Sequence, residues 1–175
     1  RDQSRRNQRS GGVLGPSAGD GLHEKQTDGA PGEGRLGRLL IVDDEPQIVR
    51  ALTPALAAAG FEVSAATGGE QALAALASEP FDVLILDLGL PDIDGKEVIL
   101  RIREWSDAPI IVLSARDLES EKIAALDLGA DDFVNKPVGV GELLARIRAV
   151  MRGRERRFVA QPKFRFGALE INFPA

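Results

Sequence analysis

The chain has 175 residues, which is enough for one full domain and additional segments. It has no cysteine, which excludes disulfides and thiolate metal sites, and its single histidine, His23, leaves little scope for a histidine-ligated metal or a His-based triad. No apolar run approaches the roughly 18 residues of a transmembrane helix, and the polar, Arg-rich N-terminus is no secretory signal, so we expect a cytoplasmic protein without membrane association.

The net charge of −5 is unevenly distributed along the chain. Residues 39–152 hold 10 Lys/Arg and 20 Asp/Glu, a net charge of −10, whereas the segments before and after them are positive. An acidic domain is a poor surface for nucleic acid. We therefore expect any DNA binding to come from outside residues 39–152.

Residues 1–38 are predicted to form a disordered N-terminal tail. Nine of the 38 are Gly, large apolar residues are scattered, and no period of 2 or 3.6 is present. His23 lies in this tail, and we interpret it as a solvated residue rather than a metal ligand.

Five short apolar runs follow, each typical of a β-strand: residues 39–42, 61–65, 83–86, 110–113 and 133–134. The third and fourth runs are almost continuously aliphatic, as expected for strands buried on both faces of a parallel sheet.

The segments between these runs have helical spacing. Three sets of residues each share one face of a predicted helix: Ile48, Leu52 and Leu56; Val98, Ile102 and Trp105; and Leu143, Ile147 and Val150. Pro46 suits the first turn of its helix, whereas Pro54 lies inside it and is expected to bend the helix without ending it. Strands alternating with helices predict an α/β fold with a doubly wound parallel sheet, whose functional site lies at the carboxyl ends of the strands.

Polar side chains stand where these strands end. Asp43 and Asp44 follow the first strand, Asp87 follows the third, Ser114 ends the fourth, and Lys136 follows the fifth. A single acid at a strand end is usually a helix cap or a loop residue. Three carboxylates at one edge are different, because they raise each other's pKa unless a cation compensates them. Oxygen ligands of this kind favour Mg²⁺.

The same residues predict phosphoryl chemistry. A carboxylate beside Mg²⁺ can attack a phosphoryl group and become an aspartyl phosphate, which makes Asp87 the predicted phosphoacceptor. Phosphoryl transfer depends on charge neutralisation and in-line positioning more than on acid–base groups. Mg²⁺ and Lys136 would supply positive charge, and Ser114 would donate a hydrogen bond to a phosphoryl oxygen. A cis bond between Lys136 and Pro137 is one way to direct the lysine into the site.

Four stretches in this order resemble the receiver domain of two-component response regulators: LIVDDE (40–45), DVLILDLGLPDIDG (82–95), IVLSAR (111–116) and GADDFVNKP (129–137). The resemblance covers residues 39–152 and implies a flavodoxin-like sheet of five strands in the order 2-1-3-4-5. The stretch most resembles the winged-helix transcription-factor branch (OmpR/PhoB type). Residues 88–91, Trp105 and residues 138–143 resemble the potassium-transport (Kdp) regulator subgroup.

The resemblance implies a role for each residue of the site. A sensor histidine kinase would phosphorylate Asp87. Mg²⁺ would be bound by Asp44, Asp87 and the carbonyl of Gly89, with Asp43 acting through water. Lys136 would contact the phosphoryl group.

The resemblance also implies that Ser114 and Phe133 form a switch pair. In this family phosphorylation pulls the hydroxyl residue inward, and the aromatic residue follows. Two positions depart from the family pattern, because Phe133 replaces the more usual Tyr and Val138 stands where Phe is common. Both departures bear on output coupling and not on the phosphoacceptor.

Six charged residues match positions that form salt bridges across a symmetric dimer in the winged-helix branch: the pairs are Lys122–Glu142, Asp132–Arg146 and Asp127–Arg148. The alternative is a solvated charged face. All six residues carry the expected sign, so we expect a homodimer on phosphorylation. Exposed pairs of this kind supply specificity more than binding strength.

The basic stretch after residue 152 predicts a linker over residues 153–163. Residues 164–175 contain two predicted strands around a Gly turn, and they resemble the opening strands of a winged-helix DNA-binding domain. We expect a chain truncated inside that domain, with the DNA-recognition helix in the missing part.

Two alternatives use the same residues. An aspartate-nucleophile phosphohydrolase also places Asp and Mg²⁺ at strand ends, but it usually has a second acid two residues after the nucleophile, where this chain has Gly89. A degenerate receiver that acts only as a binding module would not need the complete acid set with Ser114 and Lys136. We therefore predict a phosphoacceptor that is not an enzyme and assists only its own phosphorylation and dephosphorylation.

Overall fold

The structure is a computed structural model that describes residues 35–159, 164–166 and 169–171, with side chains described up to residue 157. Five strands alternate with five helices between residues 37 and 159: β1 Gly37–Val42, α1 Pro46–Ala58, β2 Phe61–Ala66, α2 Gly69–Ser78, β3 Val83–Leu86, α3 Gly95–Arg103, β4 Ile110–Ser114, α4 Glu119–Asp127, β5 Asp132–Asn135 and α5 Val140–Val159. The predicted tail up to residue 34, with His23, lies outside the described residues. None of the helices in the described part of the chain is long and apolar enough to cross a membrane.

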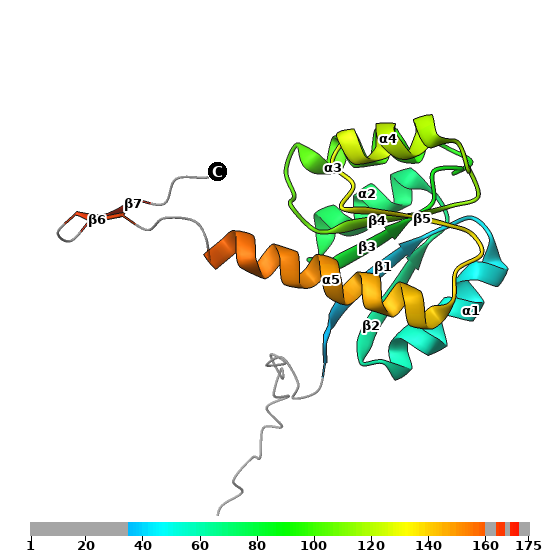
Figure 1. Cartoon of the computed structure of the whole chain (residues 1–175), viewed down its shortest axis with the longest axis horizontal. Coiled ribbons are helices and arrows are strands. Elements are labelled where there is room, and N and C mark those ends of the chain that lie inside the picture. Colours follow the sequence, from blue (N-terminus) through cyan, green and yellow to red (C-terminus); the bar gives the residue numbers. More distant parts are fainter. Residues whose placement is uncertain (1–34, 160–163, 167–168, 172–175) are drawn as a thin grey trace, which may run out of the picture. The chain divides into compact units, whose positions relative to one another are not determined.

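The five strands form one parallel sheet in the order β2-β1-β3-β4-β5 (Figure 1). This confirms the predicted doubly wound α/β fold and its strand order. β1 begins at Gly37, two residues earlier than predicted, because Gly37 pairs with Phe61 of β2. The strand order places β1 and β3 side by side, so the acids that follow them become neighbours.

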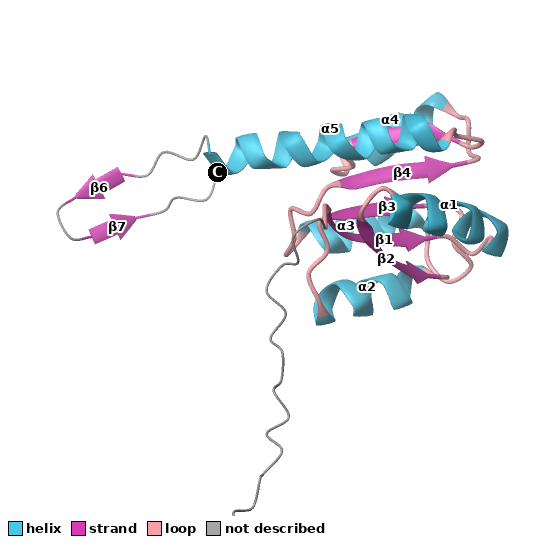
Figure 2. Cartoon of the chain, turned by 90° about the horizontal axis from the view of Figure 1, so that it is seen from below, coloured by secondary structure: helices cyan, strands magenta, loops and turns pink. Residues whose placement is uncertain are grey.

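The helices cover both faces of the sheet (Figures 1 and 2). Successive residues of a strand point to opposite faces, and β1 shows this clearly. Leu39 and Ile41 pack with Leu56 of α1 and Ile147 of α5, whereas Leu40 and Val42 pack on the face covered by α2, α3 and α4. Burying both faces of the central strands explains their continuous aliphatic sequence.

Of two predictions about the helices, one is confirmed and one is wrong. The prediction that α1 continues through Pro54 is confirmed, since the helix runs from Pro46 to Ala58. The prediction that Trp105 shares the buried face of Val98 and Ile102 is wrong. Those two side chains are fully buried, but α3 ends at Arg103 and Trp105 is 51% exposed. Helical spacing predicts a shared face only for residues inside the helix, and Trp105 lies beyond its end.

α5 is longer than the predicted domain boundary implies. It continues to Val159, so the first seven residues of the predicted linker, 153–159, are helical. Arg154 lies 3.9 Å from Asp82, and Arg157 lies 3.5 Å from Asp131. These partly exposed ion pairs link the last turns of α5 to the residues just before β3 and β5. Farther along, β6 (Phe164–Phe166) and β7 (Leu169–Ile171) pair in antiparallel fashion, which confirms the two predicted strands.

Candidate functional site

The carboxyl ends of β1, β3, β4 and β5 bring the predicted site residues to one edge of the sheet. Asp43 and Asp44 follow β1, Asp87 follows β3, Ser114 ends β4, and Lys136 follows β5. The backbone fixes the two acidic segments directly beside each other, since the N–H of Asp87 donates to the last carbonyl of β1 at 2.9 Å.

Three carboxylates, those of Asp43, Asp44 and Asp87, form a cluster at this edge. One oxygen of each lies within 4.8 Å of the other two. Asp43 and Asp87 are 2% and 7% exposed, whereas Asp44 is exposed. Oxygen ligands at these separations fit a hard cation such as Mg²⁺. Gly89 follows Asp87 by two residues, and its N–H donates to Asp87 Oδ1 at 3.2 Å, so this loop bends back toward the cluster.

The ammonium of Lys136 lies among these acids. Its Nζ atom is 2.8 Å from Asp43 Oδ2 and 3.0 Å from Asp87 Oδ2, and its peptide bond to Pro137 is cis. A third contact, 2.8 Å to Glu45 Oε1, involves a residue that sequence reasoning did not assign to the site. The sequence does contain a signal for it, because Glu45 is the third consecutive acid after β1.

These contacts control the charge of the site. Burial lowers the pKa of Lys136, but its hydrogen bonds to Asp43, Glu45 and Asp87 outweigh burial and raise the pKa above the usual range. Lys136 therefore stays positively charged. Burial also raises the pKa of Asp43, against the opposing effects of Lys136 and of the Glu45 N–H, which donates to Asp43 Oδ1 at 2.9 Å. A further cation beside this buried carboxylate would stabilise its charged form.

Ser114 and Phe133 lie on neighbouring strands. Ser114 pairs with Asn135 in the β4–β5 register, two residues beyond Phe133. Both side chains are buried, at 1% and 6% exposure, and Phe133 packs with Val112 and Ala125 in the core. The hydroxyl of Ser114 accepts a hydrogen bond from the Arg116 N–H at 3.3 Å. The aromatic ring is thus inside the protein, as expected for a side chain without a hydroxyl.

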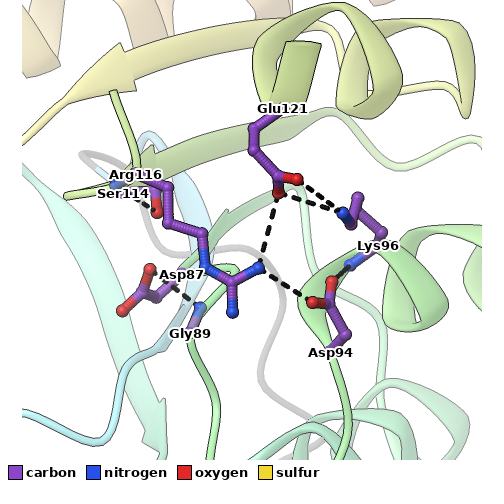
Figure 3. A network of polar contacts seen from close by, with 7 residues as sticks. All are labelled: Asp87, Gly89, Asp94, Lys96, Ser114, Arg116 and Glu121. Atoms are coloured by element: carbon purple, nitrogen blue, oxygen red, sulfur yellow. Dashed lines mark hydrogen bonds and ion pairs between the residues drawn. The ribbon is translucent and has the colours of Figure 1, made fainter. Parts of the chain in front are cut away.

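Four charged side chains tie the loop after β4 to α3 and α4 (Figure 3). Lys96 Nζ contacts both carboxylate oxygens of Glu121, at 3.0 and 2.9 Å. Arg116 Nη1 lies 2.9 Å from Asp94 Oδ2 and 3.4 Å from Glu121 Oε2. Asp94 also caps α3 by accepting from the Lys96 N–H at 2.9 Å. Sequence reasoning did not find this network, because its members are spread over 28 positions from Asp94 to Glu121.

The six predicted dimer-face residues lie on three elements: Lys122 and Asp127 on α4, Asp132 on β5, and Glu142, Arg146 and Arg148 on α5. Arg146 bridges Asp132 and Glu142 within the chain, at 2.9 Å to each. The predicted Asp132–Arg146 pair is therefore present as an intramolecular contact, and a pair between two chains would have to replace it.

Comparison with known proteins bears on this geometry. A family model described as response regulator receiver domain matches residues 39–148. The transcriptional regulatory protein KdpE of Mycobacterium tuberculosis is 54% identical over 114 residues, which cover 65% of this chain and 50% of that protein. The KDP operon transcriptional regulatory protein KdpE of Escherichia coli is 46% identical over 137 residues, which cover 78% of this chain and 61% of that protein. The chain spans about half the length of the curated relatives it matches.

Solved structures show the same fold. The BeF3-activated N-terminal receiver domain of RstA from Klebsiella pneumoniae is 29% identical with a TM-score of 0.63, covering 66% of this chain and 98% of that one. A CheY-like response regulator receiver domain protein from Methanospirillum hungatei is 28% identical with a TM-score of 0.66, covering 69% of this chain and 97% of that one. Almost the whole of each neighbour is matched, so the likeness extends over a complete domain.

Proposed function

This chain belongs to the response regulator receiver domain family, and we propose that Asp87 is its phosphoacceptor, with a sensor histidine kinase as the donor. One observation carries the proposal. The carboxylate of Asp87 lies beside two further acids within 4.8 Å and beside the buried Lys136 ammonium at 3.0 Å. A nucleophile flanked by a fixed cation and by ligands for a second cation is suited to phosphoryl transfer, which depends on charge neutralisation and positioning.

We propose that Asp44, Asp87 and the Gly89 carbonyl bind Mg²⁺, and that Asp43 acts through water. The bound ion would neutralise charge on the transferred phosphoryl group. The acidic cluster supports this assignment because its oxygens are the hard ligands that Mg²⁺ prefers and because Asp44 is exposed to solvent, from which the ion would enter.

The transfer itself uses the residues of the chain. A carboxylate oxygen of Asp87 forms a bond to phosphorus while the bond from phosphorus to the imidazole nitrogen of the kinase breaks, and the imidazole keeps the electron pair. Lys136 stays protonated and donates to a phosphoryl oxygen. Ser114 moves toward the phosphoryl group and donates a hydrogen bond from its hydroxyl to another phosphoryl oxygen. Phe133, on the neighbouring strand β5, follows this inward movement.

We propose that this domain is not an enzyme and that it assists only its own phosphorylation and dephosphorylation. An aspartate-nucleophile phosphohydrolase usually carries a second acid two residues after the nucleophile. This chain has Gly89 at that position, and glycine offers no carboxylate. A receiver that only binds a partner would not need three clustered acids, Asp43, Asp44 and Asp87, with Lys136 in contact with two of them. The geometry therefore favours a phosphoacceptor over both alternatives.

The test is the intact mass of the chain after incubation with a small phosphodonor and Mg²⁺. We expect the mass of one phosphoryl group in the native chain and none in Asp87→Asn. Asp82→Asn is the matched control, because Asp82 directly precedes β3 and Asp87 directly follows it. An unchanged gain in Asp87→Asn would refute the assignment, and rapid multiple-turnover phosphate release would favour the phosphohydrolase.

We further propose that phosphorylation promotes a homodimer through α4, β5 and α5, and that the whole protein regulates transcription. The proposed parts are a tail (1–38), a receiver domain (39–152), a linker (153–163) and the start of a winged-helix DNA-binding domain (164–175). The first seven residues of the linker continue α5. The 137-residue match to the Escherichia coli regulator is longer than the family match over residues 39–148, which supports a likeness that continues beyond the receiver domain. Sedimentation with and without a phosphoryl mimic tests the dimer, and an unchanged monomer population would exclude it.

A further inference from the structure

The loop between β3 and α3 carries Gly89, whose carbonyl is the one proposed metal ligand that is not a carboxylate. Gly89 is exposed. Beyond its chain neighbours, a side chain at this position would meet the carboxylate of Asp87, at 3.7 Å. The position of the Gly89 carbonyl therefore depends on how the rest of the loop is held.

Asp92 ties this loop to α2. Its Oδ1 atom accepts a hydrogen bond from the Gly69 N–H at 2.8 Å, and its Oδ2 atom accepts one from the Glu70 N–H at 2.9 Å. Oδ1 also accepts from the Ile93 N–H at 2.9 Å. One side chain from the β3–α3 loop thus binds two backbone donors of another helix.

α2 depends on this contact for its amino-terminal cap. Its own N-cap residue, Gly68, has no side chain that could accept these hydrogen bonds. Asp92 supplies the missing acceptor from 22 to 23 residues away, and its negative charge is favourable at the positive end of the helix. The hydrogen bonds from Glu70 and Gly69 lower the pKa of Asp92 to about 2.

Gly68 and Gly69 provide the space for this contact. A Cβ atom at Gly68 would lie 2.8 Å from Asp92 Oδ2, and one at Gly69 would lie 2.7 Å from the side chain of Val98 in α3. Both distances are too short for a real side chain. Gly68 therefore leaves room for Asp92 itself, whereas Gly69 leaves room for the next residue of the loop, Ile93, and for Val98.

We infer that Asp92 is a positioning residue for the metal site. Its carboxylate holds the β3–α3 loop against the amino end of α2, and this contact keeps the Gly89 carbonyl beside the acidic cluster. The base of the loop is closed separately, because the Gly95 N–H donates to the Leu88 carbonyl at 3.0 Å. Asp92 instead holds the part of the loop that lies between Leu88 and Gly95. The inference rests on the proposed role of Gly89 as a metal ligand.

The experiment titrates the full chain with Mg²⁺ alone and follows binding by calorimetry and by the Gly89 amide shift in NMR spectra. Asp92→Ala is expected to raise the half-saturating Mg²⁺ concentration about tenfold, the lower end of the range for losing an outer-shell partner of a metal site. Asp92→Asn keeps an oxygen that can accept from the Gly69 N–H. The half-saturating Mg²⁺ concentration of this variant should therefore rise less than that of Asp92→Ala, but measurably. Amide exchange of Gly69 and Glu70 should accelerate in both variants.

Asp82→Ala is the matched control. Its carboxylate also accepts a backbone N–H, from Arg38 at 2.8 Å, but at the opposite end of β3. The half-saturating Mg²⁺ concentration of Asp82→Ala should equal that of the native chain. If exchange at Gly69 accelerates in Asp92→Ala while Mg²⁺ binding is unchanged, Asp92 is only a helix cap and the inference is overturned.

Two other outcomes are also decisive. If Asp92→Ala does not fold, Asp92→Asn replaces it, and native Mg²⁺ binding in that variant overturns the inference. If the native chain itself binds no Mg²⁺, the proposed metal site has failed, and the inference about Asp92 fails with it. If the native chain binds Mg²⁺ but Asp87 accepts no phosphoryl group, only the proposed function has failed.

Discussion

The Nζ atom of Lys136 lies 3.0 Å from Oδ2 of Asp87, although the two residues are 49 positions apart. Each side chain is only 9% exposed. β4 lies between the strands that carry them, so the contact crosses the carboxyl edge of the sheet. It places the positive charge of Lys136 directly beside the proposed nucleophile.

Lys136→Met is expected to destabilise the domain, because it leaves the buried acids Asp43 and Asp87 without their cation. The free energy of unfolding should fall by about 3 kcal/mol, the cost of removing one partner of a buried pair. Urea unfolding in a chelator measures this loss, and added Mg²⁺ should restore part of it. Lys122→Met on α4 is the control and should have little effect. A loss that Mg²⁺ leaves unchanged would contradict the prediction.

Gly95→Ala is expected to disturb the backbone of the phosphoacceptor. A Cβ atom at Gly95 would lie 2.5 Å from the Asp87 carbonyl oxygen and 2.7 Å from the Leu88 Cα atom. Backbone atoms cannot move aside as a flexible side chain does, so we expect a loss of about 1–3 kcal/mol in urea unfolding and slower phosphorylation. Gly139→Ala is the control, because nothing lies within 4 Å of that position. Equal stability of the two variants would speak against the steric explanation.

Asp94→Ala is expected to lower the free energy of unfolding by about 1–2 kcal/mol, because Asp94 is the N-cap of α3. It also pairs with Arg116 at 2.9 Å. Asp94→Asn keeps an oxygen for the cap and removes the charge, so its loss should be clearly smaller. Chemical unfolding of both variants separates the two contributions. Equal losses would mean that the ion pair, and not the cap, holds this end of the helix.

The pH dependence of stability should report on Asp92. Its folded-state pKa is lowered from 3.8 to about 2, so its charged form stabilises the folded state. This contribution is fully present above the unfolded value of 3.8 and is lost as the pH falls through about 2. The stability difference between the native chain and Asp92→Asn should therefore be constant near neutral pH and shrink below about pH 4. Urea unfolding from pH 6 to pH 3 measures it, and a constant difference would contradict the assignment.

Arg146→Ala is expected to prevent the proposed dimer while leaving the monomer almost unchanged. Its intramolecular contacts with Asp132 and Glu142 are partly exposed, and such pairs contribute about 1 kcal/mol or less. Sedimentation of the phosphorylated chain should show a dimer for the native protein and a monomer for the variant. Arg152→Ala, an exposed change on the same helix, should behave as the native chain. A dimer of native stability in Arg146→Ala would exclude this face.

The sequence predicted the sheet well because the relevant patterns are local. Continuous aliphatic runs identified β3 and β4, and the acids that follow β1 and β3 marked the site, since parallel strands end at the same edge. The errors occurred at ends of elements. Trp105 was expected on a buried face but lies beyond the end of α3, and the predicted linker is helical up to Val159. Helical spacing does not show where a helix stops.

By itself, the sequence determined the fold class, the strand order through family resemblance, and the three acids, Asp43, Asp44 and Asp87, that cluster at one edge of the sheet. Only the tertiary structure decided which side chains meet. It brought Glu45 to Lys136 across 91 positions and Asp92 to Gly69 across 23, and it paired Arg146 with Asp132 inside one chain. The physical reason is that strand and helix patterns depend on neighbours along the chain. Contacts between charged side chains depend instead on how loops from different elements pack together.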